Sequence, residues 1–131
     1  MADCPDTMSW VDKAEEDARA ALLLSEAEAG GFGGTIVFHC QQAAEKYLKA
    51  CLVHSRIAFP RTHDLGQLVT LCVTRAEELA GLRMVADRLQ PYAVEARYPY
   101  AAPQDDEVRQ ALADMAEVRR CCRAHLRLDP D

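Results

Sequence analysis

One segment, residues 38–50, constrains the fold of this chain more than any other. Its sequence, FHCQQAAEKYLKA, combines two amides, one carboxylate and two ammonium groups with apolar residues at helical spacing. On a helix of about 3.6 residues per turn, the apolar residues form a stripe that faces a core, and the polar residues form a strip beside it. Polar groups carried into a protein interior need partners. The segment therefore predicts a core helix that bears a polar strip.

The hydrophobic pattern of the rest of the chain is also helical and shows no internal repeat. We expect the first helix to begin at Ser9, whose hydroxyl can cap it, with Asp12 in the capping-box position. A glycine cluster within residues 30–34 ends that helix, because glycine makes helix continuation entropically costly. Thr35 can cap the second helix, which extends to about His54. The polar strip therefore lies in the middle of the second helix.

Three further helices are predicted in the second half of the chain. Thr62 or Asp64 can cap the third helix. Pro91 either kinks the fourth helix or begins a short continuation of it. The fifth helix is expected to begin near Asp105 or Asp106. Helices joined by short connections form an antiparallel, up-and-down bundle, so the predicted fold class is all-α with about five helices.

Length and charge narrow the class of protein. A chain of 131 residues fits one domain, which we expect to span residues 1–131 with a core at about residues 8–127. The formal net charge of −6 argues against indiscriminate binding to nucleic acid, so any RNA contact must be local. No apolar run is long enough to span a bilayer, and the N-terminus lacks the parts of a secretory signal. We therefore expect a cytoplasmic protein without membrane contact.

The cysteines predict core packing rather than a metal site. Cys40, Cys51 and Cys72 stand at apolar helical positions, where reduced thiols pack as small hydrophobes. Cys121 and Cys122 are neighbours, and no second CxxC-like pair accompanies them, so no metal site is expected. The chain shows neither a Rossmann glycine pattern nor a serine nucleophile motif. No cofactor is expected.

The polar strip itself allows two interpretations. Its members occupy neighbouring turns: Gln42, Glu45, Lys46 and Lys49. Glu45 and Lys49 have i,i+4 spacing, and as a solvated pair they would contribute about 0.2–0.5 kcal/mol. Alternatively the strip faces a groove, in which the cations hold phosphate while an amide or a ring holds a base.

The strip also carries a family resemblance. Together with the HDL tripeptide at residues 63–65 and the ARYP segment at residues 96–99, its glutamine, glutamate and lysine resemble the signature of the HEPN family. These are small helical proteins of prokaryotes that also occur as modules in larger eukaryotic chains. The resemblance covers Trp10 to about Leu126. The family includes proposed nucleotide binders, partners of small nucleotidyltransferases and metal-independent ribonucleases.

The resemblance implies a nucleotide site on the second helix and on the segments that follow it. The candidate residues are Gln42, Lys46, Lys49, Arg61, His63, Asp64, Arg97 and Tyr98. A structural interpretation uses some of the same residues. In it, Asp64 and Glu45 anchor Arg97 and tie the chain after the fourth helix to the second, and nothing binds.

Ribonucleases of this family are associated with an arginine that precedes a histidine by four to six intervening residues and meets its copy across a dimer. The matching pairs here are Arg120 with His125, Arg119 with His125, and Arg56 with His63. None has the polar residue that commonly follows the arginine. On a regular helix, Arg120 and His125 diverge by roughly 140°, so we expect them not to share a face. A solvated cationic stripe near the negative end of the last helix is the simpler interpretation.

The expected function follows from these patterns and from the resemblance. We expect a HEPN-like helical binding protein that is not a self-sufficient enzyme. In this interpretation it is a nucleotide-binding or regulatory partner of a minimal nucleotidyltransferase in a toxin–antitoxin-like pair. Its long amphipathic helices and the family's habit of pairing predict a homodimer. One alternative is a metal-independent ribonuclease toxin that acts on RNA as a dimer through Arg120 and His125. Another is a purely structural helical adaptor.

Overall fold

The protein is a bundle of α-helices, as predicted. The computed structural model describes residues 5–94 and 102–130, and no strand occurs in these ranges. The α-helices are α1 (Thr7–Ser25), α2 (Gly33–His54), α3 (Leu65–Val73), α4 (Arg83–Leu89) and α5 (Asp105–His125). Two 3₁₀ segments, η1 (Glu77–Leu82) and η2 (Gln90–Ala93), flank α4. None of the described helices is both long and apolar enough to cross a membrane.

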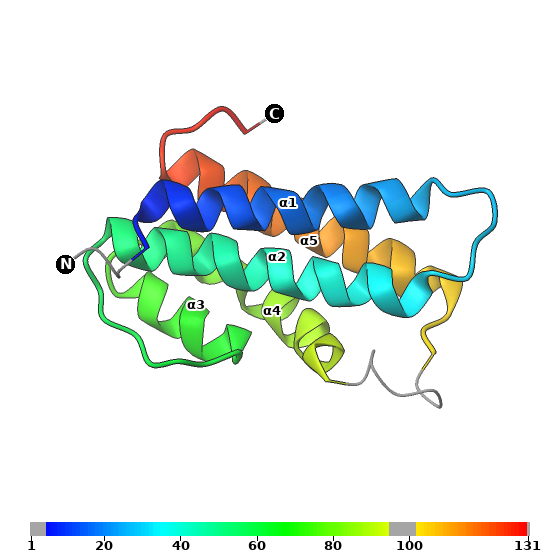
Figure 1. Ribbon diagram of the computed structural model, residues 1–131. Helices are drawn as coiled ribbons and strands as arrows, with labels where there is room; N and C mark the ends of the chain where they lie inside the picture. The colour runs from blue at the N-terminus through cyan, green and yellow to red at the C-terminus, as the bar shows by residue number, and fades with distance from the viewer. Residues whose placement is uncertain (1–4, 95–101, 131) are drawn as a thin grey trace.

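Helix α2 is the centre of the bundle and contacts each of the other four α-helices. Figure 1 shows α1 running opposite to α2, α5 running in the same direction as α2, and the short α3 and α4 packed on the other side. The apolar stripe predicted for α2 is buried at every position, from Ile36 to Leu52. In the polar strip next to this stripe, Glu45 and Lys49 are buried, whereas Gln42 and Lys46 are partly exposed.

The predicted caps of the first two helices, Ser9 and Thr35, each lie three residues after the observed N-cap positions. Helix α1 begins at Thr7, because Asp6 is the cap and its Oδ1 accepts a hydrogen bond of 2.8 Å from the Ser9 backbone N–H. Helix α2 begins at Gly33, ahead of Thr35, and has no side-chain cap. The glycines that precede it still make the turn, since Gly30 and Gly31 have φ values of 66° and 83°.

The starts of the helices in the second half of the chain agree more closely with those predicted from the sequence. Of the two proposed caps for α3, Asp64 is the one used, and it accepts from the Gln67 N–H at 3.1 Å. Pro91 stands at the start of η2, so it begins a short 3₁₀ continuation after α4. Helix α5 begins at Asp105, where Gln104 and Glu107 form a capping box.

Candidate functional site

The i,i+4 pair predicted on α2 is present, but it is not solvated. Lys49 Nζ donates to Glu45 Oε2 at 3.0 Å, and only 7% of Lys49 and 3% of Glu45 are exposed. The ammonium group also lies over two aromatic rings, 5.3 Å from the Trp10 centroid and 6.0 Å from the Phe59 centroid. The charge of Lys49 is therefore neutralised and enclosed within the fold.

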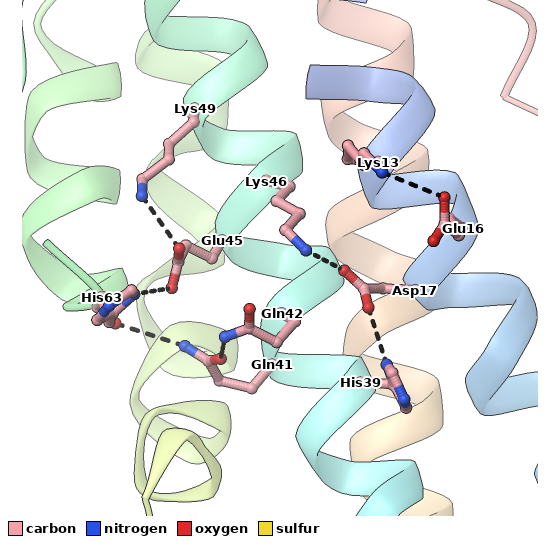
Figure 2. Close-up of polar contacts among 10 residues, drawn as sticks. All are labelled: Lys13, Glu16, Asp17, His39, Gln41, Gln42, Glu45, Lys46, Lys49 and His63. Atoms are coloured by element: carbon pink, nitrogen blue, oxygen red, sulfur yellow. Dashed lines mark hydrogen bonds and ion pairs between the residues drawn. The ribbon is translucent and has the colours of Figure 1, made fainter. Parts of the chain in front are cut away.

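The same carboxylate holds the HDL segment against α2. His63 Nδ1 lies 3.0 Å from Glu45 Oε1, and the amide of Gln41 donates to the His63 carbonyl at 3.4 Å (Figure 2). Gln41 is fully buried, and its side-chain Oε1 accepts a 2.7 Å hydrogen bond from Gln42 Nε2. These contacts fix the loop before α3 relative to the polar strip.

The other lysine of the strip is also occupied. Lys46 Nζ donates to Asp17 Oδ2 on α1, and His39 Nδ1 lies 2.8 Å from Asp17 Oδ1 (Figure 2). The Asp17 carboxylate thus joins α1 to α2 through two side chains. Neither Lys46 nor Lys49 is placed as a free cation for a phosphate group.

A hollow of about 300 Å³ lies beside the strip, between α2, the HDL segment and η2. Its walls include Gln42, His63 and Asp64, which the sequence placed in one site, together with Gln90, Ala93 and Val94. Lys46, Lys49 and Arg61 do not line it. Arg97 and Tyr98, and with them the proposed anchoring of Arg97 by Asp64 and Glu45, lie outside the described residues.

Sequence reasoning missed Gln90, the wall residue from η2. Its Oε1 accepts from the Leu65 backbone N–H at 2.7 Å and so satisfies a donor in the first turn of α3. A glutamine before a proline carries no signal of this role. Only the packing of η2 against α2 and the HDL segment brings it to the hollow.

Two of the cations at the end of α5, Arg119 and Arg123, are not free solvated charges, which corrects the sequence-based interpretation for them. Arg119 Nε and Arg123 Nη1 donate to the Glu15 carboxylate on α1, at 3.1 Å and 2.8 Å. Burial raises the pKa of Glu15, but the hydrogen bond from Arg119 and the charges of both arginines outweigh it and hold the pKa below its usual value. These arginines fasten α5 to α1.

Arg120 and His125 both border one hollow of about 280 Å³, although their side chains turn to different partners. Arg120 donates to Glu117 Oε1 at 2.7 Å, whereas His125 Nδ1 lies 3.6 Å from Glu78 Oε2. His54 was not selected from the sequence, and its ring packs edge-to-face against His125 with the centroids 5.9 Å apart.

The buried side of His125 is unusual. Its Nε2 has no hydrogen-bond partner within the described ranges, although the atom is shielded from solvent. Buried polar atoms normally find a partner, and one without a partner marks strain or function. A second hollow, of about 530 Å³, places His125 with His54, Glu78 and Arg127.

Comparison with protein-family models gives a match to the HEPN domain over residues 7–125. The match spans nearly the whole chain and includes the polar strip, the HDL segment and all of α5. The search of curated proteins and the search of solved structures each find no match.

Proposed function

The chain belongs to the HEPN domain family, and on that basis we propose that it is a helical binding protein that serves as the nucleotide-binding, regulatory partner of a minimal nucleotidyltransferase. The hollow beside α2 is the nucleotide site in this proposal. Gln42, His63 and Asp64 provide its polar walls. Glu45, which pairs with Lys49, also holds His63 at the hollow. In this proposal the protein and the nucleotidyltransferase form a toxin–antitoxin-like pair.

One observation carries the proposal. Three polar residues that the family signature and the HDL segment place in one site do meet at one hollow, which is about the size of a small ligand pocket. Gln42 and His63 are held by hydrogen bonds to the buried Gln41 and Glu45, and Asp64 is held by the exposed cap of α3. Such support from surrounding hydrogen bonds is what a binding site needs to keep its geometry.

A panel of nucleotides tests the proposal by thermal shift of the purified protein. At least one nucleotide should raise the melting temperature, and the Asp64→Asn variant should retain α3 but respond less. A ligand that binds only the folded protein stabilises it by RT ln(1 + [L]/Kd), so the shift should grow with the logarithm of nucleotide concentration above Kd. If no nucleotide shifts the transition, the structural adaptor becomes the better proposal.

The partner and the oligomeric state need separate measurements. Co-expression with a minimal nucleotidyltransferase encoded beside this chain should yield a complex that survives size exclusion. Light scattering of this chain alone should report twice 14.5 kDa, the mass of a homodimer. A strictly monomeric chain at micromolar concentration would contradict the homodimer, and failure of the two proteins to associate would contradict the partnership.

A ribonuclease is the second candidate, because Arg120 and His125 border the same hollow. An imidazole near an arginine can move the proton of a 2′-hydroxyl while the cation stabilises charge on the phosphate. The decisive test is cleavage of single-stranded RNA by metal-free protein and growth arrest on expressing this chain alone. Cleavage that is lost in His125→Ala, with the fold retained, would place this candidate first.

A further inference from the structure

The orientation of the Gln90 amide follows from its backbone partner. The Leu65 N–H can only donate, so the atom of Gln90 that faces it at 2.7 Å must be the oxygen. The Nε2 of Gln90 is then a donor with no partner among the described residues. Since Gln90 lines the hollow, it offers that donor to a ligand.

The orientation of the Gln42 amide is fixed in the same way, through one intermediate. The His63 carbonyl can only accept, so Gln41 directs its nitrogen to it and presents its oxygen to Gln42. Gln42 therefore donates to Gln41 and keeps its own Oε1 without a partner within the described ranges. The hollow has one acceptor from α2 and one donor from η2.

We infer that this hollow recognises the edge of a nucleobase, with Gln42 Oε1 accepting from the base and Gln90 Nε2 donating to it. The inference rests on the proposed nucleotide-binding function and names the part of the nucleotide that is recognised. Every base carries a donor beside an acceptor on its Watson–Crick edge. An acceptor from Gln42 and a donor from Gln90 complement that arrangement.

The charges around the hollow favour a base over a phosphate. Lys46 and Lys49 are both bound to carboxylates. The carboxylate in the wall, Asp64, uses Oδ1 to cap α3 and would repel an anion, whereas it suits a ribose hydroxyl as an acceptor. The phosphate of a bound nucleotide therefore stays outside the hollow.

Calorimetric titration of the whole chain with the four common ribonucleosides, and with ribose 5-phosphate, tests the inference. At least one nucleoside should bind without its phosphate, and ribose 5-phosphate should not. The analogue with a methyl group on the ring nitrogen of that edge (1-methyladenosine, 1-methylguanosine, 3-methylcytidine or 3-methyluridine) should bind at least about tenfold more weakly, since it loses a hydrogen bond. This comparison needs no change in the protein.

Gln90→Glu supplies the matching change in the protein. It keeps an oxygen for the Leu65 N–H and removes the donor, so the same nucleoside should bind at least about tenfold more weakly while the helical circular dichroism is unchanged. Gln67→Glu is the control, because it makes the same chemical change at an exposed position of α3 outside the hollow. Its affinity should equal that of the unmodified protein.

The outcomes separate this inference from the function on which it rests. If neither nucleosides nor nucleotides bind, the proposed function and the inference both fail. If nucleotides bind while nucleosides do not, or if the methylated analogue binds as well as its parent, only the inference fails. Equal affinity of Gln90→Glu and Gln67→Glu would also overturn it.

Discussion

The hollow beside α2 and the hollows at the end of α5 use polar residues in different ways. Beside α2, the buried Gln41, Glu45 and Lys49 all have partners, and the two glutamines with an unused donor or acceptor line the hollow. At the end of α5, a buried nitrogen of His125 has no partner among the described residues, while Arg120 turns to Glu117. The first region therefore keeps its buried polar groups paired, whereas the second retains a polar atom that costs stability.

The strongest test of this contrast is the Glu45→Gln variant. It leaves the Lys49 charge buried beside a neutral group, so the free energy of unfolding should fall by about 3–5 kcal/mol. Urea denaturation monitored by circular dichroism measures the change. A loss below about 1 kcal/mol would show that the pair behaves as a solvated one.

A double variant controls for simple loss of packing. Glu45→Met combined with Lys49→Met removes both charges and keeps apolar volume, so it should recover most of the stability lost in Glu45→Gln. If the double variant is as unstable as Glu45→Gln, the hydrogen bonds to His63 and the ring contacts of Lys49 matter more than the charge balance.

The helical pattern of the sequence was enough to predict most of the fold. Burial of the apolar stripe of α2 follows from its period alone, and the glycine turn and the Asp64 cap follow from local chemistry. The starts of α1 and α2 were missed because several residues near each start can cap a helix or stand uncapped. Choosing among them depends on packing.

The candidate site was harder to predict because its partners are remote in sequence. Lys46 pairs with Asp17, 29 residues away, and Arg123 pairs with Glu15, 108 residues away. Local spacing shows which charges share a helix face, but not which carboxylate on another helix neutralises them. Lys46 therefore resembles an available cation until the position of α1 is known, whereas the partner of Lys49 lies on the same helix and was predicted.

Acid sensitivity gives a second test, at the junction of α1 and α5. The pKa of Glu15 is lower in the folded protein than its ordinary value of 4.5. The ionised carboxylate therefore stabilises the fold at neutral pH, and this stabilisation is lost as the pH falls below 4.5. Glu15→Gln should lower stability at pH 7 by about 1.5–3 kcal/mol, the range for hydrogen bonds to charged groups. It should also flatten the decline of stability below pH 4.5. An unchanged acid profile would show that other carboxylates control it.

Replacing the residue with the unsatisfied nitrogen at the end of α5 should raise stability rather than lower it. His125→Leu removes a buried polar atom without a partner, so the free energy of unfolding should rise by about 1–3 kcal/mol. His39→Leu is the control, because the imidazole of His39 is bonded to Asp17 and its loss should destabilise the protein. A destabilised His125→Leu variant would mean that His125 Nε2 has a partner in solution, such as a water molecule.

The smallest effect is expected at the exposed pair Arg120 and Glu117. The hydrogen bond from Arg120 lowers the pKa of Glu117, yet both side chains are well exposed, so solvent screens their attraction. Glu117→Gln should therefore change the free energy of unfolding at pH 7 by less than about 1 kcal/mol. It also frees the Arg120 guanidinium at the rim of the hollow that His125 borders. If the ribonuclease candidate is correct, Glu117→Gln should raise RNA cleavage with no matching change in stability. Absence of cleavage in both forms would contradict that candidate.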